Sequence, residues 1–176
     1  MSHKSGFTLA LLAGRLVIGT ALWAAPPLLS AVQAGGSTSQ VTLYAAADST
    51  VDSARPDSSF GSEGTLGVQA VRSPFGTTTC QRTLLRFDLS SMPAGSSVNQ
   101  ATLRVYAYNR DKLGSYDLEL YRLLRAWTDV EATWDRAALD RPWGSPGAED
   151  ITDREANPVA LQSVSQLNTW YEFDVT

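Results

Sequence analysis

Residues 101–108, with the sequence ATLRVYAY, alternate strictly between two kinds of side chain. One set is small and aliphatic, and the other is amphipathic and includes Arg104, Tyr106 and Tyr108. Successive side chains of a strand point to opposite faces of a sheet. This period of two therefore predicts a strand with one face in a core and the other in water, which a helix cannot reproduce.

Shorter apolar or alternating runs recur along the chain, and Gly, Pro, Ser and Asp separate them. Residues 126–138 are predicted to hold one or two helical turns, because Thr128 and Glu131 have the spacing of a capping box. Several short strands without alternating helices predict an all-β fold, an antiparallel β-sandwich of jelly-roll type. Strands are expected at residues 41–46, 66–71, 82–89, 101–108, 116–124 and 170–175, with a short one near Val51.

The first 34 residues have the pattern of a secretory signal peptide. Lys4 and Arg15 supply positive charge, an apolar run follows, and Pro26 and Pro27 interrupt that run. Small residues then precede Ala34, where we expect cleavage. The uninterrupted apolar run is too short to cross a bilayer. The sequence therefore predicts export to the extracellular space or the cell surface, without membrane insertion after cleavage.

Removal of this segment would leave a flexible polar leader at residues 35–40 and one β-sandwich domain at residues 41–176. The segment contains two basic residues and no acidic residue, so the net charge of −4 becomes −6 when it is removed. A negative domain of this size is a poor ligand for nucleic acid or for an anionic membrane, and both are excluded as expected partners.

The chain contains one histidine and one cysteine, and neither is placed for catalysis. His3 lies in the expected signal peptide, so the mature domain would have no imidazole for a Ser–His–Asp or Cys–His site. Cys80 has no partner for an internal disulfide, and we expect it to be a half-buried strand residue. These observations predict a domain that is not an enzyme.

Four segments resemble the DNRLRE-domain group, which is similar to carbohydrate-binding module family 96. They are TLYAAADSTVDSARPDSSFGS at residues 42–62, RTLLRFDLSSMPAGSSVNQATLRVYAY at 82–108, LYRLLRAWTDVEATWD at 120–135 and WYEFDVT at 170–176. The second segment is the most specific, with its Arg-Phe-Asp-Leu, its Pro-x-Gly turn and the alternating strand. The four segments occur in the order in which the family has them.

The resemblance implies a non-catalytic polysaccharide-binding module of a secreted or cell-surface protein. In the family at least one more strand follows the equivalent of residues 173–176, so we expect this chain to be part of a larger secreted protein and to lack its last strand. The alternative is a structural or adhesive spacer without sugar specificity. A small polysaccharide-degrading enzyme is disfavoured because histidine is missing from the expected mature domain.

Candidate carbohydrate-binding residues come from the amphipathic face of the alternating strand and from one loop. Arg104, Tyr106 and Tyr108 offer a guanidinium and two aromatic rings, which suit a polysaccharide, including an acidic one. Arg122 is expected beside them on a neighbouring strand, and Trp143 is the tryptophan expected to be exposed. The alternative for the strand is an ordinary solvent-facing surface with cross-strand tyrosine pairs.

Trp127 and Trp134 are expected to have a structural role. They are seven residues apart, which would place both on one side of a short helical element and direct them into the sandwich.

Asp48, Asp52 and Asp57 lie in one stretch rich in Ser, Asp and Gly, and they are the candidate metal ligands. Calcium prefers six to eight oxygen ligands, and loops of this composition in secreted sandwiches supply them. The spacing does not match an EF-hand loop. The alternative is that these aspartates cap their own turns.

Overall fold

A computed structural model describes residues 6–12, 16–19, 39–110 and 114–176, and within these ranges the chain forms strands, turns and loops without a helix. No described segment is a helix long and apolar enough to cross a membrane. The strands are β1 (Gly6–Leu12), β2 (Leu16–Gly19), β3 (Ala45–Asp52), β4 (Leu66–Arg72), β5 (Thr78–Asp88), β6 (Thr102–Arg110), β7 (Tyr116–Arg122), β8 (Arg136–Ala138), β9 (Arg141–Pro142), β10 (Ala160–Val164) and β11 (Thr169–Asp174).

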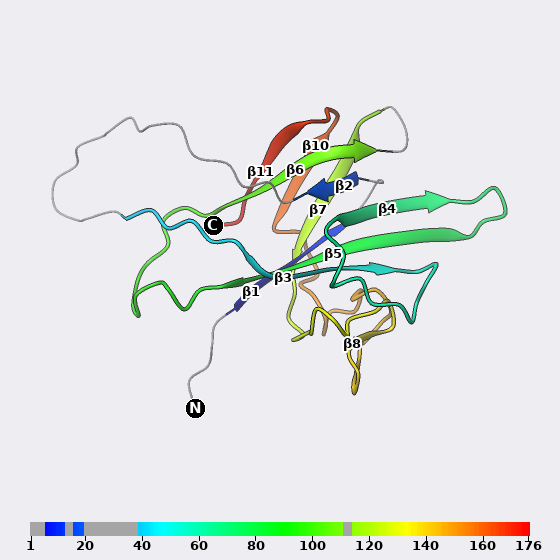
Figure 1. Cartoon of the computed structure of the whole chain (residues 1–176), viewed down its shortest axis with the longest axis horizontal. Coiled ribbons are helices and arrows are strands. Elements are labelled where there is room, and N and C mark those ends of the chain that lie inside the picture. The colour runs from blue at the N-terminus through cyan, green and yellow to red at the C-terminus, as the bar shows by residue number, and fades with distance from the viewer. Residues whose placement is uncertain (1–5, 13–15, 20–38, 111–113) are drawn as a thin grey trace.

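Nine of these strands form two antiparallel sheets that share an edge (Figure 1). Sheet A has the order β10-β7-β1-β5-β3. Sheet B has the order β4-β2-β6-β11, and β4 also pairs with β5 of sheet A. The all-β antiparallel sandwich that the sequence predicts is confirmed.

The main core lies between the two sheets, and the alternating patterns build it. From β6, Leu103, Val105 and Ala107 are buried, and from β7, Leu118 and Leu120 are completely buried. Removing such side chains from water is the dominant favourable term in folding. The other members of this core come from β4, β5, β10 and β11, namely Leu66, Val68, Leu85, Val164 and Phe173.

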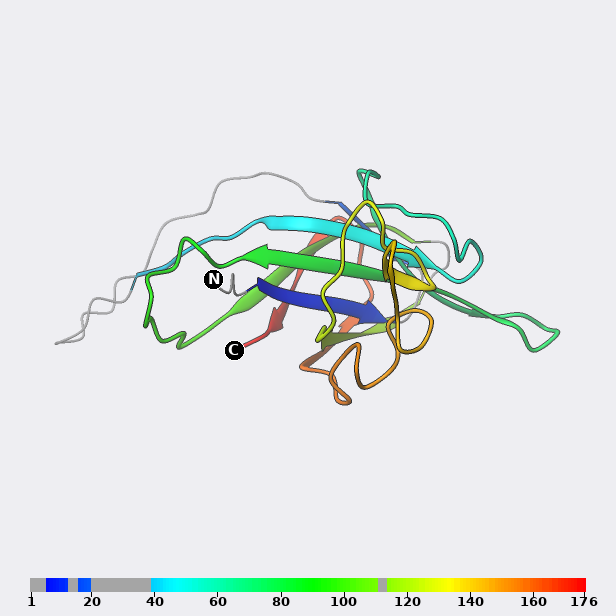
Figure 2. The same cartoon turned by 90° about the horizontal axis from the view of Figure 1, so that it is seen from below.

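A second core lies on the outer side of sheet A, beneath residues 123–155, which we call the cap. Ala47 and Val51 of β3 and Leu84 of β5 form its floor. The cap appears as the yellow and orange loops below β3 and β5 in Figure 1, and Figure 2 shows it from another side. The cap contributes Leu123, Trp127, Ala132, Ala137, Trp143 and Ala148 to this core.

Two arginines of β5 attach the cap to sheet A. Arg82 is 3% exposed and donates to the carbonyl of Gly147, while its second terminal nitrogen lies 2.7 Å from a carboxylate oxygen of Glu149. Arg86 donates to the carbonyl of Trp127 over 3.0 Å. Each guanidinium also lies over an indole ring of the cap. The outer face of sheet A is therefore covered over β3 and β5, and the outer face of sheet B over β6 and β11 is exposed.

Three local predictions differ from the structure. Residues 126–138 contain a turn in which Ala132 donates to the carbonyl of Thr128, but no helix, because cap residues pack against sheet A and against one another. The strand expected at residues 41–46 begins only at Ala45, and it continues through the short strand expected near Val51 as the single strand β3, in which Ser49 and Thr50 are buried. The short strand β10 escaped prediction, because its five residues lack a clear alternation.

The strands β1 and β2 lie within the expected signal peptide. β1 pairs with both β5 and β7, and β2 pairs with both β4 and β6, so each fills a central position of its sheet. The expected cleavage site after Ala34, the Pro26–Pro27 interruption and most of the flexible leader at 35–40 lie outside the described residues. Without these strands, β7, β5, β4 and β6 would each lose a hydrogen-bonded neighbour.

We therefore predict that a chain beginning at Gly35 is less stable than the chain beginning at Met1. Without β1 and β2, the backbone groups of β4, β5, β6 and β7 that pair with them lose their hydrogen bonds. The shorter chain also buries less surface, so its unfolding exposes less. Urea denaturation followed by tryptophan fluorescence should show a lower midpoint and a smaller slope for the shorter chain. Identical midpoints would show that β1 and β2 contribute nothing to stability.

Replacing Arg82 should release the cap. Arg82→Ala should lower the free energy of unfolding by about 3 kcal/mol, because the carbonyl of Gly147 loses its buried donor and the side chain leaves a void. Arg104→Ala is the matched control, since its side chain is 56% exposed and its ion pair should be worth less than about 1 kcal/mol. Equal losses in the two variants, measured by urea denaturation, would contradict this role for Arg82.

Candidate functional site

The exposed outer face of sheet B carries an aromatic and charged cluster from two neighbouring strands. The register places Tyr106 of β6 opposite Trp170 of β11, and Arg104 opposite Glu172. Residues that are directly opposite in an antiparallel pair share a face. Together with Tyr108, two residues along β6, these five side chains form what we call the Trp170 face.

The aromatic rings and the arginine of this face are in contact. The ring centroids of Tyr106 and Trp170 lie 5.2 Å apart with planes tilted by 58°. The guanidinium carbon of Arg104 lies 5.1 Å from the Trp170 ring centroid, and its Nε lies 3.0 Å from a carboxylate oxygen of Glu172. These contacts restrict the orientation of the Trp170 indole ring on the sheet surface.

The core on the opposite side of the same strands holds this face in place. Leu103 and Val105 of β6 and Phe173 of β11 point inward and are nearly completely buried. Because side chains alternate along a strand, burial of these residues directs Arg104 and Trp170 outward. The face is therefore set by packing and register, before any ligand is present.

The charges on the Trp170 face and its margins are balanced. Arg104 and Arg110 of β6 carry positive charge, and Glu172 and Asp174 of β11 carry negative charge. Arg110 donates to the carbonyls of Gly114 and Ser165. Hydrogen bonds from Thr176 hold the pKa of Asp174 below its ordinary value, so this carboxylate stays charged at neutral pH.

Two of the predicted binding residues do not belong to this face. Trp143 is 5% exposed and donates through Nε1 to the carbonyl of Thr133, so the expectation that it is exposed is wrong. Its polar-looking loop is part of the cap and folds onto sheet A. Arg122 lies at the end of β7 in sheet A, 3.4 Å from Glu155, and not beside β6 as expected.

Trp170 is the residue that sequence reasoning did not assign to this face. Of the four tryptophans among the described residues, Trp127 and Trp143 are buried, Trp134 is half-buried beneath Arg82, and Trp170 is 38% exposed. The structural role expected for Trp127 and Trp134 agrees with their packing in the second core, but they lie on no helical element and pack on the outer side of sheet A, not between the sheets as expected. The alternation in WYEFDV places Trp170 opposite the core, but only the pairing of β11 with β6 brings it to Tyr106.

The three candidate metal ligands do not lie in one loop. Asp48 and Asp52 belong to β3, and Asp57 is exposed in the following turn. Asp52 is buried and accepts hydrogen bonds from Arg55, from Gln81 and from the backbone of residue 54. Across the part of the chain that the structure describes, no three His, Cys, Asp or Glu side chains gather as metal ligands do.

The surroundings of Asp48 disfavour the charged form of its carboxyl group. Burial raises the pKa of the Asp48 carboxyl above its ordinary value, and the nearby charge of Asp129 raises it further. The folded protein therefore holds this proton more tightly than the unfolded chain does. Stability falls as pH rises from the unfolded pKa, about 3.9, through the folded pKa.

Asp48→Asn should consequently stabilise the protein at neutral pH. The amide has the shape of the carboxyl but no charge, so both the desolvation cost and the repulsion by Asp129 disappear. The gain in the free energy of unfolding should be present at pH 7. It should be absent near pH 3, where the Asp48 carboxyl is protonated and both the original chain and the Asp48→Asn variant are uncharged at this position. Loss of stability at pH 7, measured by thermal or urea denaturation, would contradict the argument.

The sandwich has one outer face packed against the cap over β3 and β5 and one open aromatic face over β6 and β11. A comparison with family models matches residues 39–143, more than half of the chain, to carbohydrate-binding module family 96. The chain belongs to this family. No curated protein and no solved structure matched the chain. This match confirms the resemblance that the sequence predicts and supports a carbohydrate-binding module.

Proposed function

We propose that this protein is a non-catalytic polysaccharide-binding module whose ligand lies on the Trp170 face. The observation that carries the proposal is the exposed Trp170 ring, held against Tyr106 and Arg104 on the open sheet. Sugar rings have apolar faces that pack on indole, and their hydroxyls need polar groups beside it. The Trp170 face supplies a ring, a guanidinium, a carboxylate and tyrosines on one surface.

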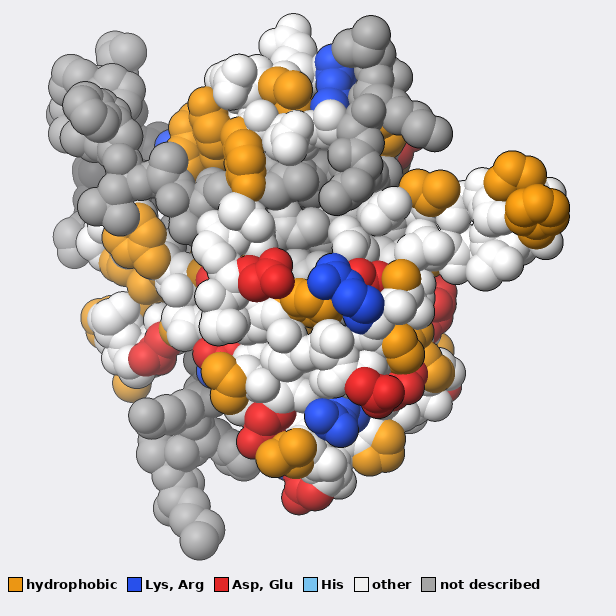
Figure 3. Space-filling view, turned by 45° about the vertical axis from the view of Figure 1, so that its right-hand side comes forward, with side chains coloured by type: hydrophobic (Ala, Val, Ile, Leu, Met, Phe, Trp, Pro, Cys, Tyr) orange, Lys and Arg blue, Asp and Glu red, His pale blue; other side chains and the backbone are white. Residues whose placement is uncertain are grey.

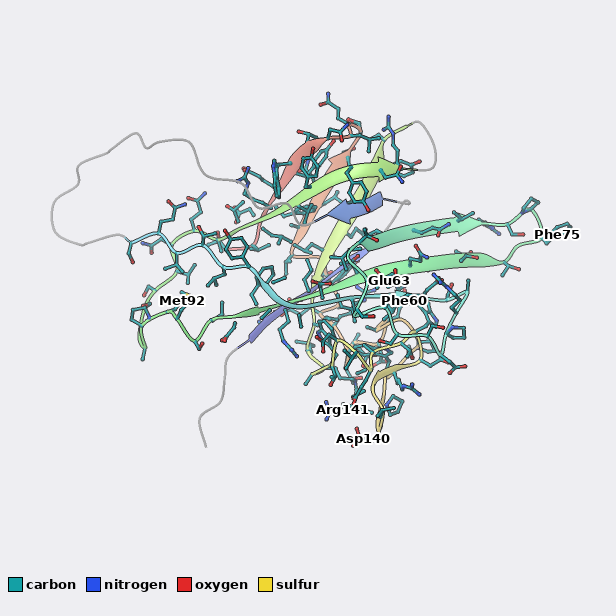
Figure 4. The ribbon with its side chains drawn as sticks, viewed as in Figure 1. Phe60, Glu63, Phe75, Met92, Asp140 and Arg141 are labelled. Atoms are coloured by element: carbon teal, nitrogen blue, oxygen red, sulfur yellow. The ribbon has the colours of Figure 1, made fainter. Side chains whose placement is uncertain are left out.

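The closed side of the molecule supports the same choice. The cap buries Trp127 and Trp143 against sheet A, so these rings are not available to a ligand. The hairpin of β4 and β5 ends at Phe75, which is 96% exposed but stands alone at a tip far from the sheet face (Figure 4). Tyr44 is also more exposed than Trp170, at 72% against 38%, but the Trp170 ring is the one in contact with both a second aromatic ring and an arginine.

We also propose that the module acts outside the cell, as part of a larger secreted or cell-surface protein. The basic, apolar and small-residue sections of the first 34 residues support this proposal, as does the family. Export followed by cleavage after Ala34 would remove β1 and β2. The module would then tether the protein that carries it to a polysaccharide.

Replacement of Trp170 tests the proposed face. Trp170→Ala should lower affinity for a retained polysaccharide at least about tenfold, about 1.4 kcal/mol, because the stacking ring is lost. Affinity electrophoresis and pull-down against a panel of soluble and insoluble glycans measure the effect. Phe75→Ala is the matched control, since it removes an exposed aromatic ring far from the Trp170 face. This variant should bind the polysaccharide with unchanged affinity.

Two outcomes would contradict the proposal. Unchanged retention of a folded Trp170→Ala variant would place the glycan elsewhere on the molecule. No retention of the folded protein by any glycan would favour a structural or adhesive spacer in a surface protein. Circular dichroism and the urea midpoint confirm that each variant is folded.

A further inference from the structure

The outward side chains of β6 and β11 form a row that runs along both strands. Trp170 lies opposite Tyr106 in the register of the two strands, and Glu172 lies opposite Arg104. Tyr108 extends the row by one further outward position on β6. Each residue of a strand rises about 3.3 Å, so the row is about 13 Å long between Arg104 and Tyr108. The Trp170 face is therefore longer than a single sugar ring, which is similar in size to the benzene part of an indole.

The row is narrow in the other direction. Its side chains come from two neighbouring strands, and neighbouring strands of a sheet lie about 4.8 Å apart. In the strand order that the described residues form, β11 is the last strand of sheet B, so the sheet has an open edge beside the row. A polysaccharide that crossed the strands would pass this edge after one strand spacing. A chain that follows the strands stays in contact with aromatic and charged side chains over the whole row.

Contacts within the row are continuous from one position to the next. The Trp170 ring centroid lies 5.2 Å from that of Tyr106, across the strand pair. It lies 5.1 Å from the guanidinium carbon of Arg104, one outward position along β6. Nε of Arg104 in turn lies 3.0 Å from a carboxylate oxygen of Glu172. A sugar packed on Trp170 would therefore have the next sugar of its chain beside the donors of Arg104 and the acceptors of Glu172.

The row is an open surface and not a pocket. The side chains of Arg104 and Glu172 are 56% and 61% exposed, and Trp170 is 38% exposed. On the surface in view in Figure 3, apolar side chains are interspersed with charged and polar ones and do not form one large apolar area of the kind that protein partners cover. A site for a chain end encloses the terminal sugar and buries most of its surface. On an open row, the bound chain keeps one side in water and has room to continue beyond the sugars in contact.

We propose that the Trp170 face binds an interior stretch of a polysaccharide chain that lies along β6 and β11, without requiring a chain end. This inference rests on the proposed function of the same face. One sugar packs on the Trp170 ring. Its neighbours lie beside Arg104 and Glu172 on one side and beside Tyr108 on the other. With one sugar at each of these positions, the row spans about three sugar units, and Tyr108 is an outer contact of longer ligands.

Partial depolymerisation separates binding to chain interiors from binding to chain ends. It raises the number of ends per gram and leaves the number of interior stretches almost unchanged. The probes are alginate, mixed-linkage β-glucan, galactomannan and arabinoxylan, each intact and shortened about tenfold, and each titrated calorimetrically with the intact chain. For the polymer that binds, the number of sites per gram should change less than about twofold. A site for chain ends would instead give about ten times as many.

Ligand length tests the extent of the row. Among oligosaccharides of the polymer that binds, the hexasaccharide should bind at least about tenfold more tightly than the disaccharide, because contacts along one chain reinforce one another. Tyr108→Ala should lower the hexasaccharide affinity by a factor at least about three times larger than the factor for the disaccharide, which is too short to cover the row.

Tyr44→Ala is the matched control for this substitution. Tyr44 is 72% exposed and precedes β3 of sheet A, so its removal should change neither the hexasaccharide affinity nor the disaccharide affinity. The urea midpoint shows that each variant is folded. The length series of the intact chain tests the row without any substitution.

The possible failures are distinguishable. A number of sites per gram that rises in proportion to the chain ends, with binding lost in Trp170→Ala, would overturn the interior mode and leave the proposed face intact. Equal affinities for the disaccharide and the hexasaccharide, or an equal effect of Tyr108→Ala on both, would overturn the extended row. Binding that survives Trp170→Ala, or no binding of the folded protein to any polymer, would overturn the proposed function and this inference with it.

Discussion

The attachment of the cap by β5 determines which surface of this molecule is open. Arg82 and Arg86 reach outward from β5 of sheet A and donate to backbone carbonyls of the cap, and each guanidinium lies over an indole ring. A buried guanidinium without these partners would cost several kcal/mol in desolvation. Because the partners are supplied by residues 40 or more positions away in sequence, the two arginines tie a long irregular segment to the sheet.

This attachment leaves the two outer faces of the sandwich with different properties. Sheet A is covered over β3 and β5 by the second core, so the tryptophans of the cap that pack there are structural. No segment that the structure describes covers sheet B in this way over β6 and β11, and the outward side chains there form the Trp170 face. The inward residues Leu103, Val105 and Phe173 are nearly completely buried, and this packing fixes the positions of the outward ones. A preformed face of this kind loses little conformational entropy when a ligand binds.

The sequence predicted those features that depend on local alternation. The strand at 101–108, its buried aliphatic set and its outward Arg104 and Tyr106 follow from the period of two, and Leu118 and Leu120 follow from the same rule in β7. The half-buried place of Cys80 in β5 was also predictable. Family resemblance, carried by four segments in order, indicated carbohydrate binding before the fold was known.

Features that depend on pairing between distant residues could not be predicted. Trp170 meets Tyr106 only because β11 pairs with β6 in one register, and nothing in either segment specifies that register. Trp143 looked exposed because Arg-Pro-Trp-Gly is polar, yet its indole is buried when the cap folds onto β3 and β5. Arg122 was placed beside β6 because both strands alternate, although the connection carries β7 into the other sheet.

The central claim is that a polysaccharide binds on the Trp170 face of sheet B. The most direct measurement is a titration of the isotopically labelled protein with a retained oligosaccharide, followed by the indole N–H signals of its tryptophans in two-dimensional NMR spectra. The account predicts that the Trp170 signal shifts with ligand concentration, while the signals of the buried Trp127 and Trp143 stay in place. A stationary Trp170 signal, with shifts confined to residues of the cap or of sheet A, would contradict it.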